Sequence, residues 1–278
     1  MGSMTSCPQP AGRSRTREFD AAIWGVKRGG RPARVIDRDG IEVVFLDAGG
    51  VLLYPDWERV SGILKRYGIR ATSAQLADAE FIGKHRMDEL GVTHTTGDIA
   101  EPDGYLGWVM KATGLSFDND ALHRAAREFE ETHTRDNLWS DMPEEVPGAL
   151  ARMRDAGYRL AVLSNTESNL RDRIAAAGIG PFFETLVISA EVGSEKPDHV
   201  IFDEALRRMA VTPDRALHVG DFYSIDVVGA RGVGITPVML DARGLSSDRD
   251  VLRVASLTEL ADLLGSDSDQ LQIGARVS

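Results

Sequence analysis

The chain has 278 residues, 42% of them hydrophobic, which is enough for one well-packed domain with an insertion or for two modest domains. Its formal net charge of −11 argues against a nucleic-acid partner, because phosphate backbones favour basic surfaces. No apolar run reaches the roughly 20 residues of a membrane span, and Cys7 is the only cysteine, so an internal disulfide is excluded. We therefore expect a cytoplasmic protein with a small ligand, without a prediction of its oligomeric state.

The two ends of the chain are polar. Residues 1–40 carry several arginines, serines and prolines, and residues 266–278 carry few apolar side chains. We expect 1–40 to be a partly disordered tail and lead-in, and 266–278 to be a polar C-terminal tail.

From residue 41 onward, short apolar runs alternate with segments of helical periodicity. This pattern predicts a doubly wound, Rossmann-like α/β core built on a parallel sheet. The predicted strands are 41–46, 158–163, 185–189, 216–219 and 235–240. The predicted helices between and after them are 146–156, 169–177, 198–209 and 256–264. Gly157 and Gly178 follow two of these helices, as is typical of a helix C-terminus.

More than a hundred residues separate the first two predicted strands. An ordinary connection has about 2 to 6 loop residues on each side of one helix, so another unit is inserted here. Trp57, Val60, Ile63 and Leu64 recur at helical spacing, and further helix-like segments follow. We predict a helical cap domain at 56–142 and an α/β core made of 41–55 and 143–265.

Polar residues follow four of the predicted strands at the edge where ligands bind in open α/β sheets. In chain order they are Asp47, the pair Ser164 and Asn165, Lys196, and the pair Asp221 and Asp226. One such residue alone is often a helix cap. Independent capping does not predict this succession of residue types, so the pattern indicates a site.

These motifs, in this order over residues 41–240, resemble those of the haloacid dehalogenase-like hydrolase superfamily, in which a helical cap can follow the first motif. The resemblance implies that Asp47 is a nucleophile that attacks phosphorus and forms an aspartyl-phosphate. Ser164 and backbone amides near Asn165 would bind the phosphoryl oxygens, and Lys196 would neutralise their charge.

The same resemblance implies a Mg²⁺ site and a substrate class. Asp47, the backbone carbonyl of Gly49 and Asp221 would hold the ion, with Asp226 beside it to orient Lys196 or a metal-bound water. The residues expected to contact substrate in addition to Asn165 are Gly50, Trp57 and His85. The expected enzyme is a magnesium-dependent phosphatase for a small phosphorylated metabolite.

Gly49 departs from the phosphatase pattern, which carries a second Asp at this position as general acid and base. Such a group commonly contributes 10² to 10⁴-fold in rate. One explanation is a substrate with a good leaving group, such as an acyl or anomeric phosphate. Another is a proton donor from the cap, for which the candidates are His85, His94, His133, Asp88 and Glu89.

Two further explanations change the reaction or remove it. Relatives that hydrolyse phosphonates have a small residue at the position of Gly49 and use a cap lysine as a Schiff base, for which Lys65, Lys84 and Lys111 are the candidates. Relatives that dehalogenate 2-haloacids need no metal, and the retention of Asp221 and Asp226 argues against that reaction. The last alternative is a phosphometabolite-binding protein with weakened or lost catalysis.

Overall fold

The computed structural model describes residues 40–91, 104–166 and 169–265. The predictions for the two tails and for His94 therefore concern residues that lie almost entirely outside the described ranges. None of the described helices is long and apolar enough to cross a bilayer.

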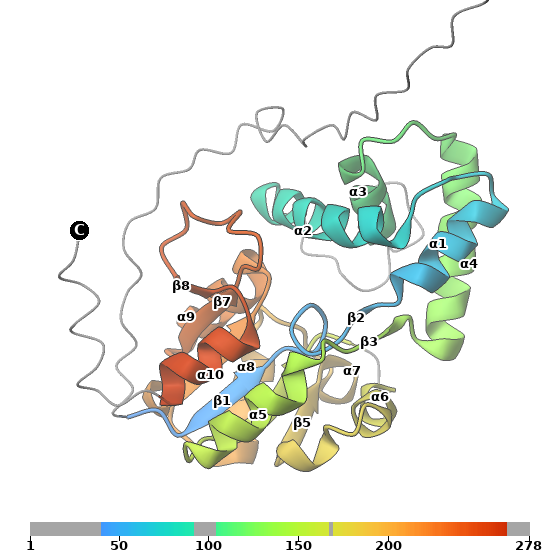
Figure 1. Ribbon diagram of the computed structural model, residues 1–278. Helices are drawn as coiled ribbons and strands as arrows, with labels where there is room; N and C mark the ends of the chain where they lie inside the picture. The colour runs from blue at the N-terminus through green and yellow to red at the C-terminus, as the bar shows by residue number, and fades with distance from the viewer. Residues whose placement is uncertain (1–39, 92–103, 167–168, 266–278) are drawn as a thin grey trace, which may run out of the picture.

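Six strands form one parallel sheet in the order β5-β4-β1-β6-β7-β8, as predicted for a doubly wound core (Figure 1). Their bounds are Val43–Leu46 for β1, Arg159–Ser164 for β4, Thr185–Ile188 for β5, Ala216–Gly220 for β6, Thr236–Leu240 for β7 and Leu252–Val254 for β8. The strands β1, β4, β5, β6 and β7 each begin and end within two residues of a predicted strand. β8 was not predicted, because three residues with two half-buried side chains carry no strand pattern.

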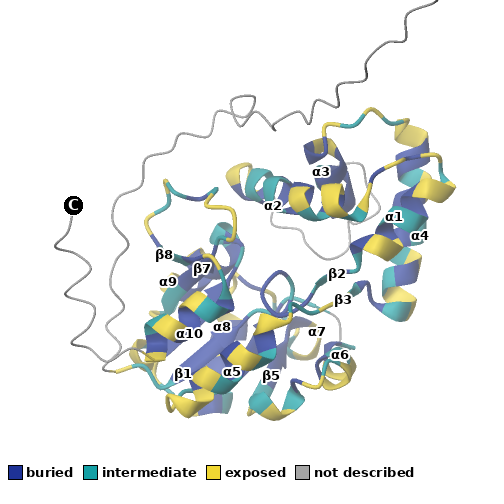
Figure 2. Ribbon diagram, viewed as in Figure 1, coloured by how far each residue is buried: buried dark blue, intermediate teal, exposed yellow. Residues whose placement is uncertain are grey.

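Helices cover both faces of this sheet. One face packs against α5 (Glu145–Asp155), α6 (Leu170–Ala176) and α10 (Leu257–Gly265), and the other against α8 (His199–Met209) and α9 (Val228–Gly232). Every residue of β1 is buried, because this central strand is covered on both faces. Figure 2 shows the buried strands between helices whose outer faces are exposed. Short helical segments complete the core: η2 (Gly180–Phe182), α7 (Ser189–Val192), η3 (Pro213–Arg215) and η4 (Tyr223–Val227).

The segment between β1 and β4 contains four helices, which Figure 1 shows grouped on the side toward which β1 runs. They are α1 (Trp57–Arg66), α2 (Ser73–Glu89), α3 (Tyr105–Ala112) and α4 (Asn119–Asp136), and all four correspond to predicted helical segments. Their apolar faces form one hydrophobic cluster, which also includes Phe222 and Ile225 from the segment after β6. Two short antiparallel strands, β2 (Tyr54–Pro55) and β3 (Trp139–Asp141), join this group to the core.

Polar side chains begin three of these four helices. Asp56 accepts a hydrogen bond from Arg59 N at the start of α1, and Asp118 caps α4 in the same way. Thr72 and Gln75 form a capping box at the start of α2. The sequence analysis predicted these helices from the spacing of apolar residues, and the caps are a further local signal of where each helix starts.

Helix α2 also bonds to the core. The Asp88 carboxylate accepts hydrogen bonds from the backbone N–H groups of Tyr223 (2.9 Å) and Ser224 (2.8 Å), at the start of η4. Arg243 of the core forms an ion pair with Asp78. These contacts hold α2 against the segments that follow β6 and β7.

Gly229 permits the loop containing Lys196 to pack closely on α9. A Cβ atom at this position would lie 2.5 Å from Phe202 Cε2 and 3.0 Å from Pro197 Cα. We therefore expect Gly229→Ala to lower the free energy of unfolding by about 1–3 kcal/mol through overpacking. Gly232→Ala is the matched control on the same helix, because nothing lies within 4 Å of its added Cβ. Urea titration of both variants checks the prediction, and an equal effect in the two would contradict it.

Candidate active site

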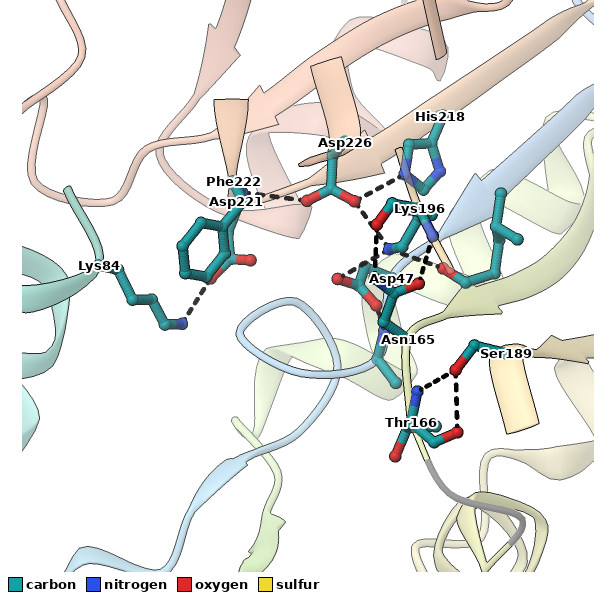
Figure 3. Close-up of polar contacts among 12 residues, drawn as sticks. Asp47, Lys84, Asn165, Thr166, Ser189, Lys196, His218, Asp221, Phe222 and Asp226 are labelled. Carbon is teal, nitrogen blue, oxygen red and sulfur yellow. Dashed lines mark hydrogen bonds and ion pairs between the residues drawn. The ribbon is translucent and has the colours of Figure 1, made fainter. Parts of the chain in front are cut away.

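Asp47 and Asp226, two of the residues predicted after the strands, meet at the ammonium group of Lys196 (Figure 3). Its Nζ lies 3.1 Å from Asp47 Oδ2 and 2.7 Å from Asp226 Oδ1. Asp47 follows β1 directly, and its Oδ1 accepts a hydrogen bond from Ala48 N at 2.7 Å. The Lys196 and Asp226 side chains are each 1% exposed, whereas that of Asp47 is 14% exposed. Asp47 is therefore the member of this trio that can meet a ligand.

Backbone and amide groups fix the position of Lys196. Its Nζ donates to Leu163 O at 3.1 Å. The Asn165 side chain bonds to both backbone groups of Lys196, donating to its carbonyl at 2.8 Å and accepting from its N–H at 2.7 Å. Burial opposes the charge on Lys196, but Asp226 and Asp47 outweigh it and hold the pKa of the ammonium above its usual value.

His218 joins this cluster although the sequence analysis did not single it out. It lies in the middle of β6, fully buried, and its Nε2 is 3.0 Å from Asp226 Oδ1. The other Asp226 oxygen accepts from Phe222 N at 3.0 Å. Burial would raise the pKa of Asp226, but Lys196 and His218 hold it below its usual value. A histidine inside an otherwise apolar strand was the available signal, and it was overlooked.

A second ion-pair network joins α2 to the site. Lys84 Nζ lies 2.5 Å from Asp221 Oδ2 and 2.9 Å from Glu80 Oε1, and Tyr105 donates its hydroxyl to the same Glu80 oxygen at 2.6 Å. Burial would lower the pKa of Lys84, but Asp221 and Glu80 overcome it and hold the pKa well above its usual value. At Gly50, where φ is +74°, an added Cβ would overlap the Asp221 carboxylate and approach Lys84. The turn after Asp47 therefore requires glycine.

The three aspartates provide a donor set suited to a hard divalent cation. One carboxylate oxygen each from Asp47, Asp221 and Asp226 lies within 4.8 Å of the others. Mg²⁺ prefers such oxygen ligands. Asp226 already accepts bonds from Lys196, His218 and Phe222 N, so Asp47 and Asp221 have the more available oxygens. The three aspartates therefore fit the predicted Mg²⁺, with Asp226 beside the ion and not among its main ligands.

A cavity of about 170 Å³ opens over Asp47. Ser164, Asn165, Lys196, Asp221 and Gly49 line it, as the sequence analysis expected.

Trp57, His85 and Gly50 are not among the residues that line this cavity. Trp57 is 7% exposed because it packs into the apolar cluster of the inserted helices. His85 and Gly50 border a smaller neighbouring cavity of about 30 Å³. That Trp57, His85 and Gly50 contact substrate stays a prediction, because these residues lie outside the lining of the cavity over Asp47.

The candidates for replacing the acid missing at Gly49 differ in whether they line the cavity over Asp47. His133 lines the cavity, whereas Asp88 is engaged by the start of η4 and Glu89 is exposed. Among the candidate lysines, Lys84 lines the cavity, and Lys65 and Lys111 lie exposed on α1 and α3. Trp139 also lines the cavity, and the lining residues that the sequence analysis did not name include Tyr105, Glu130 and Asn137.

Asp221 makes the stability of the protein depend on pH when no divalent cation is added. Burial raises its pKa to about 7, Asp226 and Asp47 add to the rise, and Lys84 opposes it. The unfolded carboxyl titrates near 3.9. Between these two pKa values the folded protein binds a proton at Asp221 that the unfolded chain has lost. The contribution of Asp221 to the free energy of unfolding is therefore fully present below pH 4 and is lost as the pH rises through 7.

We expect wild type to lose on the order of 1–3 kcal/mol relative to Asp221→Asn between pH 5 and pH 8, measured by urea titration. The comparison with the variant is needed because His133 acts in the opposite direction: burial, with Arg173, lowers its pKa to about 4. His133 is present in both proteins and its effect cancels. Parallel pH profiles for the two proteins would rule out Asp221 as the source.

Removing the Lys84 charge is expected to destabilise the protein strongly. Lys84→Met leaves two carboxylates, Asp221 and Glu80, without their cation in a buried setting, which costs about 3–5 kcal/mol in comparable cases. Lys65→Met is the control, because Lys65 is exposed on α1 and a surface change is within about 0.5 kcal/mol. Equal unfolding midpoints for the two variants would show that the Lys84 pairs contribute nothing to stability.

A family model and several known proteins match this chain in sequence. The family model described as haloacid dehalogenase-like hydrolase matches residues 41–234. Phosphoserine phosphatase of Thermus thermophilus is 37% identical over 193 residues, which cover 66% of this chain and 76% of that protein. Glyceraldehyde 3-phosphate phosphatase of Methanothermobacter thermautotrophicus is 37% identical over 102 residues, which cover 36% of this chain and 45% of that protein. The chain thus spans less than half the length of this second relative.

Solved structures share the fold. A phosphatase of the same family from Thermococcus onnurineus superposes with a TM-score of 0.52 at 22% identity, covering 82% of this chain and 99% of that one. A 2-haloacid dehalogenase from Pseudomonas syringae gives a TM-score of 0.50 at 21% identity, covering 81% and 98%. At this identity the likeness concerns the fold, since the two proteins are named for different reactions.

Proposed function

Because the chain belongs to the haloacid dehalogenase-like hydrolase family, a family of hydrolases, we propose that it is a Mg²⁺-dependent phosphatase that acts on a small phosphorylated metabolite through Asp47. The observation that carries the proposal is the convergence of Asp47, Lys196 and Asp221 on one cavity at the carboxyl end of β1. Two of the relatives are named as phosphatases of small phosphorylated metabolites, glyceraldehyde 3-phosphate and phosphoserine, which agrees with it.

In the first step an Asp47 carboxylate oxygen attacks phosphorus, and the bond between phosphorus and the leaving oxygen breaks. The Lys196 ammonium, already 3.1 Å from Asp47, neutralises charge on the phosphoryl oxygens. Ser164 and the backbone after it line the same cavity and would donate hydrogen bonds to those oxygens. Water then attacks the aspartyl-phosphate and restores the Asp47 carboxylate.

Mg²⁺ held by Asp47, Asp221 and the Gly49 carbonyl would screen the repulsion between the nucleophile and the phosphoryl group. Asp226 acts on Lys196 in this scheme, because both are buried and their 2.7 Å contact fixes where the ammonium lies. Asn165 has the same role through the Lys196 backbone. These contacts organise the charge before substrate arrives.

Replacing the nucleophile tests the proposal. Asp47→Asn keeps the shape but removes the attacking carboxylate, so Mg²⁺-dependent release of phosphate should fall by about 10⁴-fold or more across a panel of phosphate esters and acyl phosphates. Asp203→Asn, an exposed aspartate on α8, is the matched control and should retain activity. Phosphate release by Asp47→Asn at the wild-type rate would sink the proposal. Ligand binding without turnover in wild type would favour a phosphometabolite-binding protein.

Phosphonate hydrolysis is a second candidate, because Lys84 lines the cavity. A Schiff base needs a neutral amine, and the two carboxylates paired with Lys84 hold its pKa well above the usual value, which works against this reaction. Borohydride in the presence of a phosphonate carrying a carbonyl group would trap an adduct on Lys84 if this reaction occurs. Turnover of that phosphonate without any trapped adduct would exclude the Schiff base.

A further inference from the structure

The space beside Gly49 is occupied by an indole ring. A Cβ atom added at Gly49 would lie 3.4 Å from Trp139 Nε1 and 3.5 Å from Trp139 Cδ1. Those are ordinary contact distances, so the Cβ itself fits, but it points at the ring. A carboxylate at residue 49 would have to pass or displace the indole. The Trp139 indole therefore occupies the region next to residue 49, the position that carries an acid in most phosphatases of the family.

Trp139 is held in place by its neighbours. Its ring centroid lies 4.8 Å from that of His133, 5.3 Å from that of Tyr105 and 6.1 Å from that of Phe129. Its backbone N–H donates to Asn137 Oδ1 at 2.9 Å, and Asn137 has a positive φ of 49°. The indole N–H is a hydrogen-bond donor that does not release its proton at any ordinary pH. Trp139 can stabilise an anion but cannot protonate one.

His133, the cavity-lining candidate for a replacement acid, is also held as a neutral donor. Its Nδ1 accepts the backbone N–H of Leu138 at 3.1 Å, so the ring proton sits on Nε2. Burial, with Arg173, lowers the pKa of the ring to about 4. Near pH 7 the imidazole has no second proton to give. Two neutral N–H donors thus line this side of the cavity.

The two lysines and the tyrosine on the described wall of the cavity are already paired with carboxylates. Lys196 and Lys84 are paired with carboxylates, and Tyr105 gives its hydroxyl proton to Glu80. Burial, with Glu80, holds the pKa of Tyr105 well above its usual value. Apart from the three aspartates of the proposed Mg²⁺ site, Glu130 on α4 is the carboxyl group of the described lining that could act as an acid in place of residue 49. It is the rival that an experiment has to test.

We propose, on the basis of the function proposed above, that the substrate is an activated phosphoryl compound such as an acyl phosphate, whose leaving group departs as a stable anion beside Trp139 and His133. The Asp47 oxygen forms its bond to phosphorus, the bond between phosphorus and the acyl oxygen breaks, and the electron pair leaves on the carboxylate without a proton. Water then attacks phosphorus, the bond to Asp47 breaks to restore its carboxylate, and both protons of the water stay on the phosphate product. Neutral donors suit such a leaving group, since it needs stabilisation and no acid.

The test compares leaving groups of similar size with the full chain and Mg²⁺. Rates for 4-nitrophenyl phosphate and phenyl phosphate, and for acetyl phosphate and ethyl phosphate, report how far turnover depends on leaving-group basicity. We expect kcat/KM to be about 10² to 10⁴-fold higher for the activated member of each pair, the range that a general acid would otherwise supply. Equal values within a pair would overturn the inference while leaving the proposed phosphatase intact. No turnover of any probe would overturn both.

Variants separate the indole from the rival acid. Trp139→Phe keeps a ring and removes the N–H, so kcat/KM for acetyl phosphate should fall by about 10-fold or more while the thermal midpoint shows whether the fold persists. Should that variant fail to fold, His133→Asn provides the same readout, because its amide oxygen can still accept the Leu138 N–H while the Nε2 donor is lost. A selective loss of phenyl phosphate turnover in Glu130→Gln would assign the acid to Glu130 and overturn the inference.

Discussion

The site depends on one buried cation, Lys196, which lies between two carboxylates. A lysine whose side chain is 1% exposed would destabilise the fold without charged partners. Asp47, directly after β1, and Asp226, in η4 after β6, are those partners. Those two strands are neighbours in the sheet, so their following residues meet around the ammonium. Without this positive charge, the carboxylates that a phosphate must approach would repel both the substrate and each other.

The ties around Lys196 come from the core. Leu163 O and the Asn165 side chain fix it from the end of β4, and His218 adds a bond to Asp226 from within β6. Each contact comes from a strand end or strand interior in the rigid sheet. The charged part of the site is therefore built on the least deformable layer of the protein.

The inserted helices add a different set of groups to the same cavity. They bring Lys84 to Asp221 and anchor α2 to the core through Asp88. Through the link formed by β2 and β3 they place Trp139 beside Gly49. In the proposed reaction, residues that follow the strands of the sheet act on the phosphoryl group, and residues of the insertion and its link surround the leaving group.

Local patterns in the sequence determined most of the fold. Short apolar runs, capping residues and terminal glycines predicted five strands of the sheet and the long helices, because each signal acts within a few residues. The resemblance carried by Asp47, Ser164, Lys196, Asp221 and Asp226 depended only on motif order along the chain. The family model and the sheet agree with that reading.

Only the tertiary structure determined the contacts between residues that are distant in the chain. Lys84 and Asp221 are 137 positions apart, and no local pattern predicts their pairing. Trp57 has helical spacing that suits either a pocket or a core, and packing against the other helices assigned it to the core. The same packing placed Trp139, and not an acid, beside Gly49. The sequence could show that an acid is missing, but the group that fills its place follows from how an insertion packs on a sheet.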